Sequence, residues 1–269
     1  MALLLITLPA LAQEAPPPAP GREAPMDAER PAPRPSPPEN TPPENAPPEN
    51  APPAKPREEP PPSESAAQPD PDARAMRETL REKDFPYSAC LLDLTLLGAR
   101  YREEPPITDP DQRDCGIARP IRLDAPLPGI EIAGGAVMRC ETAWHLAHWL
   151  RDFVLPAAAL LPGGIRPVAI EPGTTYQCRA TVGDATENLS EHAFGNAFDV
   201  SALRFSDGSR FQIQPRQGKG DMAEAFQAAI RASACLHFTT VLGPGANAAH
   251  DDHLHLDIKP RKNGWRLCQ

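Results

Sequence analysis

The pattern of apolar and polar residues divides the chain near residue 73. Before it, large apolar side chains are almost confined to the first twelve residues, and after it periodic patterns recur. We predict a helix over residues 72 to 82, and a strand over residues 90 to 99, where the sequence CLLDLTLLGA alternates or runs apolar. A further strand is predicted over residues 116 to 123.

The second half of this region alternates helical and extended patterns. Residues 138 to 155 predict a long helix, with apolar positions at Trp144, Leu146, Trp149, Leu150 and Phe153. The other predicted elements are a strand over 167 to 170, a turn at Gly173 into 174 to 179, a helix over 221 to 234, a strand over 237 to 242 and a final strand within HDDHLHLDI. Short strands with interspersed helices predict an α+β domain over residues 73 to 269, in which a small antiparallel sheet has helices on one face.

Composition separates a proline-rich segment from this domain. Residues 16 to 71 hold 22 of the 37 prolines, and no aromatic residue precedes Phe85. With its PPENT and PPENA repeats and few apolar side chains, such a chain cannot offset the entropy of ordering. We therefore predict that residues 13 to 72 form a disordered spacer biased to polyproline II. The alternative is low-complexity filler without a function.

The first twelve residues, MALLLITLPALA, form a short apolar run that ends in small residues. This pattern is typical of the end of a secretory signal, and the run is too short to cross a membrane. We therefore predict export to the periplasm or the exterior, without a transmembrane segment. The alternative interpretation is a disordered apolar terminus.

Charge argues against nucleic acid as a partner. Residues 14 to 72 carry 12 acidic and 5 basic residues, so −7 of the chain's net charge of −9 lies there and −2 is left for the rest. A nearly neutral domain lacks the basic stripe that nucleic-acid binding usually needs. The remaining residues, about 195, are enough for one domain, and they leave the oligomeric state open.

All six cysteines lie in the domain, and none forms a CxxC pair of the kind found in zinc knuckles and redox motifs. An even number of scattered cysteines in an exported domain predicts disulfides. We expect Cys235 and Cys268 to join the C-terminal tail to the preceding helix. Buried free thiols are the alternative.

Two short segments carry most of the candidate chemistry, residues 190 to 201 (SEHAFGNAFDVS) and residues 250 to 257 (HDDHLHLD). On a strand, side chains two residues apart share a face. His253, His255 and Asp257 would therefore lie on one face, and the intervening leucines would lie on the other face, toward the core. In the first segment Gly195 allows the backbone to turn or to approach a neighbour closely between a histidine and an aspartate.

Hydrolytic zinc sites use three protein ligands and a water. Two histidines and one aspartate from these segments meet this requirement. Either segment alone would be weak evidence, because HxH occurs often by chance. His145 and His148 lie one helical turn apart, but no acid follows at the position that a helical zinc motif needs. We interpret that pair as surface or packing histidines.

The first segment matches the pattern SxHxxGxAxD of the zinc peptidases of the D-Ala-D-Ala carboxypeptidase, lysostaphin and Hedgehog group. The ending HxxHxH resembles that of the penicillin-insensitive murein endopeptidases in this group. With the proline-rich arm and the scattered cysteines, the chain most closely resembles the bacterial extensin-like protein family, over roughly residues 75 to 269.

This resemblance implies roles for individual residues. His192, Asp199 and His255 would be the zinc ligands, and His253 would serve as general base or steady the oxyanion. Asp252 stands where the carboxypeptidase branch has a catalytic glutamate. We prefer His253 as the base, with Asp252 or His250 fixing its tautomer.

Two upstream residues complete the expectation. Arg179 in YQCR resembles a strand arginine of the group that contacts substrate or the oxyanion, and an ordinary surface ion pair is the alternative. Ser190 is expected to cap the turn before His192.

The resemblance implies a zinc-dependent peptidase or amidase that acts on peptidoglycan stem peptides or their cross-links. One alternative is a non-catalytic, zinc-containing cell-wall-binding module, and another is an adhesin without metal. A fourth protein ligand, for instance Asp257 or His250, would argue against catalysis because no position would be left for water.

Overall fold

The structure is a computed structural model that describes residues 74–181 and 188–269. The described residues belong to one compact unit, Ser65–Gln269. The predicted signal segment (1 to 12) and the predicted linker (13 to 72) lie outside the described residues.

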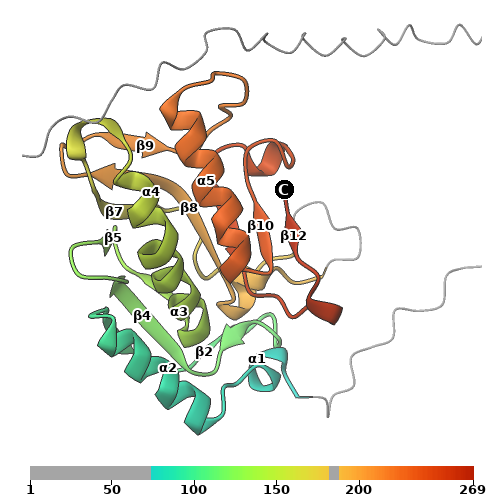
Figure 1. Ribbon diagram of the computed structural model, residues 1–269. Coiled ribbons are helices and arrows are strands. Elements are labelled where there is room, and N and C mark those ends of the chain that lie inside the picture. The colour runs from blue at the N-terminus through green and yellow to red at the C-terminus, as the bar shows by residue number, and fades with distance from the viewer. Residues whose placement is uncertain (1–73, 182–187) are drawn as a thin grey trace, which may run out of the picture. The chain divides into compact units, whose positions relative to one another are not determined.

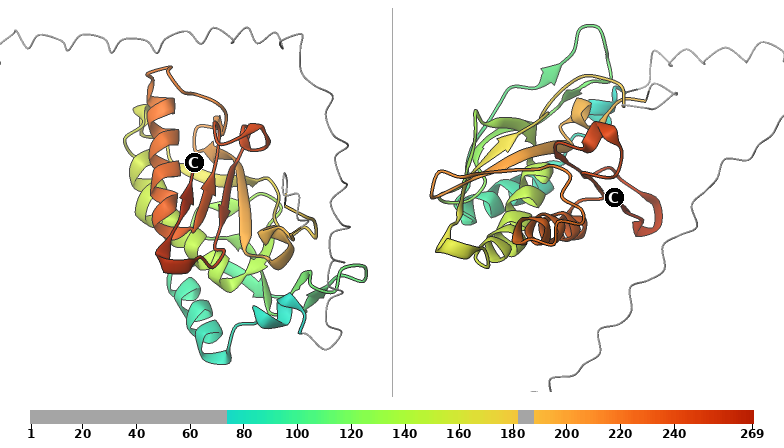
Figure 2. Two further views of the ribbon diagram at one scale, coloured as in Figure 1. Left: turned by 90° about the vertical axis from the view of Figure 1, so that its right-hand side faces the viewer. Right: turned by 90° about the horizontal axis from the view of Figure 1, so that it is seen from above.

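Helices and strands form two layers, which confirms the predicted α+β class. Helices α3 (Cys140–Trp149), α4 (Leu155–Ala158) and α5 (Met222–His237) lie on one side of the strands in the views of Figures 1 and 2. A π-helical turn, Leu150–Val154, joins α3 to α4, so the predicted helix over 138 to 155 is one continuous helical segment. No helix in the described part of the chain has the length and apolar character to cross a bilayer.

The main sheet has seven strands in the described residues, with the order β12-β10-β11-β8-β7-β5 and β9 paired to β8. It comprises β5 (Glu131–Ile132), β7 (Pro167–Pro172), β8 (Ala197–Phe205), β9 (Arg210–Gln212), β10 (Thr240–Leu242), β11 (Leu254–Asp257) and β12 (Leu267–Cys268). Pairing is antiparallel except for β5 with β7 and β10 with β12. The sheet is therefore larger and more mixed than the small antiparallel sheet that we predicted.

Two smaller sheets precede it in the sequence. One contains β1 (Arg100–Glu103), β4 (Pro120–Ala125) and β6 (Ala136–Arg139), and the other contains β2 (Ile107–Thr108) and β3 (Gly116–Ile117). The predicted strand over 116 to 123 is thus two strands in different sheets. The segment 174 to 179 belongs to no strand, contrary to the resemblance.

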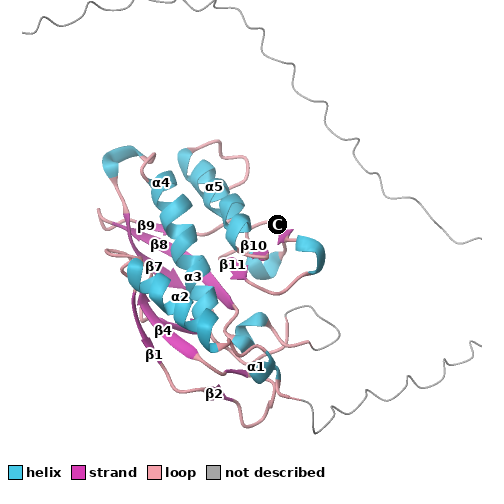
Figure 3. Cartoon of the chain, turned by 60° about the horizontal axis from the view of Figure 1, so that its bottom comes forward, coloured by secondary structure: helices cyan, strands magenta, loops and turns pink. Residues whose placement is uncertain are grey.

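The prediction of a strand over residues 90 to 99 is wrong, since most of this segment lies in helix α2 (Asp84–Leu96; Figure 3). Tyr87 and Leu94 are both buried, and their spacing of two helical turns places them on one face. A continuous apolar run does not by itself distinguish a strand from a helix. Cys90 also forms a disulfide with Cys140 of α3. The helix predicted over 72 to 82 is short, α1 (Met76–Thr79).

Alternation along β8 and β11 divides their side chains between the core and the opposite face. Phe198 and Val200 of β8 and Leu254 and Leu256 of β11 are fully buried in the main hydrophobic cluster. This cluster includes Trp149 and residues of α5, so it lies between the sheet and the helices. Intervening residues of the two strands consequently point away from the helical layer.

All six cysteines form disulfides, as predicted. The pairs are Cys90 with Cys140, Cys115 with Cys178, and Cys235 with Cys268, and no free cysteine remains. The last pair was predicted from the sequence. The second pair ties residues 174 to 179 to the residue just before β3, although 63 positions separate its cysteines.

His145 and His148 have packing and hydrogen-bonding roles. His148 Nε2 lies 2.7 Å from an Asp93 carboxylate oxygen on α2. The His145 ring contacts Trp144 and Phe238, and within the described residues its buried Nδ1 has no hydrogen-bond partner. Burial lowers the pKa of His145 to about 4, and the charges of His237 and Arg266 add to the effect.

The low pKa predicts a loss of stability in acid. Between pH 6.5 and 4 the unfolded state binds a proton at His145 that the folded state does not bind, so the free energy of unfolding falls as the pH falls through this range. From pH 7 to pH 5 the contribution is about 2 kcal/mol. We expect His145→Phe to remove this part of the loss, as measured by urea unfolding at both pH values. An equal loss in the variant and the wild type would contradict the prediction.

Candidate metal centre

Strand pairing brings Asp199 and His255 together. Strands β8 and β11 are antiparallel, and in their register His255 lies directly opposite Asp199, between the pairs Leu254 with Val200 and Leu256 with Phe198. Since those neighbours point into the core, both candidate ligands lie on the face away from the helices. Directly opposite side chains on one face of a sheet are close enough to share a ligand.

His192 reaches the same point from a 3₁₀ turn, Glu191–Phe194, just before β8. The Ser190 hydroxyl accepts a hydrogen bond from the backbone N–H of His192, as expected. Gly195 ends the turn with φ of 68°, and a Cβ there would lie 2.4 Å from Ile117 Cδ1. This position therefore requires glycine both for its backbone conformation and for its close packing.

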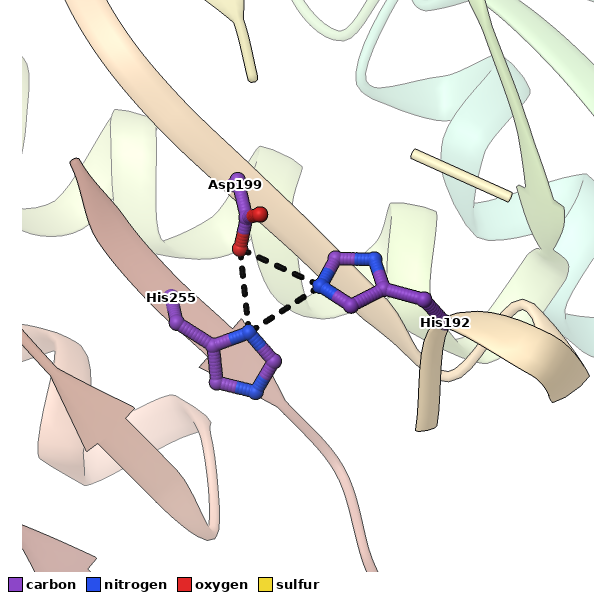
Figure 4. Close-up of side chains that lie close together, drawn as sticks. All are labelled: His192, Asp199 and His255. Atoms are coloured by element: carbon purple, nitrogen blue, oxygen red, sulfur yellow. Dashed lines mark hydrogen bonds and ion pairs between the residues drawn. The ribbon is translucent and has the colours of Figure 1, made fainter. Parts of the chain in front are cut away.

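The three side chains converge with a geometry that suits a small cation (Figure 4). Asp199 Oδ1 lies 3.0 Å from His255 Nδ1 and 3.2 Å from His192 Nε2, and the two nitrogens are 3.1 Å apart. Tetrahedral zinc with nitrogen and oxygen ligands separates its ligand atoms by about 3.4 Å. These three separations are shorter by only a few tenths of an ångström. No other group of three or more His, Cys, Asp or Glu residues in the described ranges could hold a metal ion.

Neighbouring groups fix the tautomer of each histidine. The Thr175 carbonyl oxygen lies 2.6 Å from His192 Nδ1, so this nitrogen donates and leaves a lone pair on Nε2. Asp257 Oδ2 lies 3.1 Å from His255 Nε2, which likewise leaves the Nδ1 lone pair toward Asp199. Two imidazole lone pairs and a carboxylate oxygen thus face one point. The two lone pairs and the carboxylate oxygen repel one another unless a proton or a metal ion lies between them. Two nitrogens and one oxygen are ligand atoms that zinc prefers.

Electrostatics of the site agree with this arrangement. Burial raises the pKa of Asp199, but its contacts with His192 and His255 outweigh burial and hold the pKa well below its usual range. Asp257 shows the same balance, with its pKa lowered by His255. Burial lowers the pKa of His255, but hydrogen bonds with Asp199 and Asp257 raise it overall to about 9.

His253 lies at the edge of the triad. Its Nδ1 is 2.8 Å from Asp252 Oδ1, so this nitrogen donates to the carboxylate and leaves the Nε2 lone pair free. Nε2 is 3.7 Å from Asp199 Oδ2 and therefore faces the candidate metal ligands. Asp252 itself points mostly into solvent, with 81% of its side chain exposed. Of the two candidates for the base, the imidazole of His253 is the one directed at the triad.

The remaining candidates lie farther out. Arg179 donates to Gln177 Oε1 and to the carbonyl of Ala180, and it lines a cavity together with His250 and His255. His250 Nδ1 lies 2.7 Å from Asn247 Oδ1, so it does not hold the tautomer of His253. Asp257 contacts the nitrogen of His255 that points away from the triad. Within residues 74–181 and 188–269, neither His250 nor Asp257 supplies a fourth ligand.

Comparison with known proteins identifies the domain. The family model described as Extensin-like protein C-terminus matches residues 88–269, which is more than half of the chain. The chain belongs to this family. Neither the curated proteins nor the solved structures include a significant match to it. The resemblance of the extensin-like domain to zinc peptidases stays a prediction from its sequence motifs.

The sequence analysis missed a polar network that contacts the 3₁₀ turn Glu191–Phe194, which carries the candidate ligand His192. The buried Arg139 guanidinium contacts Glu82 at 2.8 Å and Asn196 Oδ1 at 2.7 Å. Asn196 in turn donates to Glu191 in the turn of His192. The backbone N–H of Arg139 also donates to the carbonyl of Gly195. Asn196 stands inside the recognised motif, whereas Arg139 is 57 positions upstream and has no motif to mark it.

Asp257, which accepts a hydrogen bond from His255 Nε2, provides a test of the candidate metal centre. We expect Asp257→Ala to lower zinc affinity about 10- to 100-fold, because the carboxylate orients the ring of His255 and increases its basicity. Asp257→Asn keeps a hydrogen-bond acceptor and loses only the charge, so its effect should be smaller. Isothermal titration with zinc measures both. Equal affinity in the wild type and Asp257→Ala would show that this contact does not act on the metal.

Proposed function

We propose that the extensin-like domain is a zinc-dependent peptidase or amidase that acts on peptidoglycan stem peptides or their cross-links. The observation that carries the proposal is the convergence of two imidazole lone pairs and one buried carboxylate oxygen, each oriented by its own neighbour. Among the described residues three candidate metal ligands converge and no fourth lies with them, which is the arrangement expected of a hydrolytic zinc site.

The residues around the triad support hydrolysis in particular. A bound zinc ion would lower the pKa of water and polarise the scissile carbonyl. His253 would accept the proton of the attacking water at Nε2 and later deliver it to the leaving amine. Asp252 holds the ring of His253 in the tautomer that this transfer requires, through the contact at Nδ1. Thr175 and Asp257 likewise fix the tautomers of the candidate ligands His192 and His255.

The three disulfides favour an oxidising compartment, which is consistent with a periplasmic or secreted protein and with access to the cell wall. The choice of peptidoglycan as substrate depends on the resemblance of SEHAFGNAFD and HDDHLH to the murein-cleaving zinc peptidases. Ser190 has a structural role in this proposal, since its hydroxyl caps the turn of His192.

Digestion of muropeptides tests the proposal directly. Full-length protein loaded with one equivalent of zinc is incubated with purified cross-linked and uncross-linked muropeptides. The products are separated by liquid chromatography and identified by mass spectrometry. We expect cleaved stem peptides, and we expect a chelator to stop their release. If the peptides stay intact while the protein holds zinc, the catalytic proposal fails and the zinc-containing wall-binding module takes its place.

A further inference from the structure

A small cationic cavity lies beside the candidate metal centre. It has a volume of about 200 Å³ and is lined by His255 and Asp257 of β11. Three cationic side chains also line it: Arg179, Lys259 and Arg261. These residues come from two segments that are 80 positions apart in the sequence, and strand β11 brings the second of them next to the metal ligands.

Two of the three cations have no anionic partner among the described residues. Arg179 donates only to an amide oxygen and to a backbone carbonyl. Arg261 donates to the Thr240 hydroxyl and lies over the ring of Trp265, while its Nε is buried without a hydrogen-bond partner. A buried guanidinium N–H without an acceptor is costly, and a ligand oxygen would satisfy it.

The two acids of the cavity wall are already engaged. Asp257 accepts from His255 Nε2 and from the backbone N–H of Lys259. Glu191 accepts from Asn196 and lies 3.5 Å from Lys259 Nζ. Positive charge is therefore in excess in this cavity. Arginine presents paired N–H groups in a plane, which match the two oxygens of a carboxylate.

We propose that this cavity binds the free terminal carboxylate of a peptide whose last amide bond lies at the metal centre. Arg261, whose Nε lacks an acceptor, then determines specificity, and Lys259 adds a second positive charge that Glu191 partly neutralises. The domain acts at the C-terminal end of a peptide rather than in its interior. The inference rests on the proposed function only for the location of the scissile bond. Binding of the carboxylate itself requires no turnover.

The test compares two peptides that differ only in the terminal group. L-Lys-D-Ala-D-Ala and its C-terminal amide are titrated by calorimetry into zinc-loaded full-length His253→Gln, in which turnover is suppressed. We expect the acid to bind at least about tenfold more tightly than the amide, since a charge-assisted bidentate contact contributes more than a neutral one. Equal binding, or no binding of either peptide, overturns the proposal.

Variants assign the preference to the cavity. In the same background, Arg261→Gln and Lys259→Gln should each reduce the ratio of acid to amide affinity toward one. Arg261→Lys should reduce it less, because the charge remains and the paired N–H groups are lost. Lys259 is well exposed, so its variant is expected to fold even if Arg261→Gln does not. Arg100→Gln serves as the control, because Arg100 on β1 forms an exposed ion pair with Glu131 on β5.

A third peptide distinguishes the terminal carboxylate from a side-chain carboxylate. D-Glu-L-Lys-D-Ala-D-Ala amide carries its acid only on the glutamate residue, and we expect it to bind as weakly as the other amide. Tight binding of this peptide would contradict the terminal assignment. Failure of the wild type to hydrolyse any peptide, with the acid preference intact, would remove the proposed enzyme activity and leave the binding site in place.

Discussion

Replacing His192 by alanine is expected to abolish stoichiometric zinc binding and, with it, hydrolysis of muropeptides. The Nε2 lone pair of His192 is one of the three donors, and the residue is fully buried. Loss of an outer-sphere partner of a metal ligand already costs 10- to 100-fold in affinity, so loss of a ligand should cost more than about 100-fold. Zinc content after dialysis, measured by plasma mass spectrometry, and calorimetric titration provide the two measurements.

His237→Ala is the matched control for this experiment. His237 lies at the end of α5 and contacts Phe153 and His145, so it removes an imidazole elsewhere in the fold. The control should bind one equivalent of zinc and cleave muropeptides as the wild type does. Circular dichroism establishes that His192→Ala is folded. A folded His192→Ala protein that still holds one tightly bound zinc would show that the triad is not the metal site.

The identity of the candidate ligands could be predicted from the sequence because each stands in a short motif. The resemblance implied the candidate ligands His192 and Asp199, and local geometry accounts for the cap at Ser190 and the left-handed turn at Gly195. Alternation in HLHLD likewise predicted correctly which side chains of β11 enter the core. Local rules of this kind depend on residues only a few positions apart.

Apart from the Cys235–Cys268 disulfide, the properties that depend on long-range pairing could not be predicted. The register that places His255 opposite Asp199 joins strands more than fifty positions apart, and no local pattern determines it. The backbone carbonyl of Thr175 fixes the His192 tautomer. Since every residue has a backbone carbonyl, the sequence does not indicate which one makes this contact. Misassignment of residues 90 to 99 has the same origin. The apolar pattern does not distinguish a strand from a helix, and of these residues only Leu94 is buried, in a helix that the Cys90–Cys140 disulfide joins to α3.

Substitution of His253 by glutamine is expected to lower kcat about 10²- to 10⁴-fold while zinc remains bound. His253 is not among the three metal ligands, so its loss should leave zinc content and affinity close to those of the wild type. Its Nε2 lies 3.7 Å from the carboxylate of the candidate ligand Asp199, so it would be near a water held by a bound zinc ion. The acidic limb of the pH profile of kcat should change in His253→Gln, because that limb reports the essential base.

Asp252→Asn distinguishes the two candidates for the base. If Asp252 only orients His253 through the 2.8 Å contact at Nδ1, its replacement should cost less, about 10- to 100-fold, and should keep the shape of the pH profile. If the carboxylate itself takes the proton, Asp252→Asn should be the more damaging variant and His253→Gln the milder one. The exposure of Asp252 to solvent and the direction of His253 Nε2 toward the triad favour the first outcome.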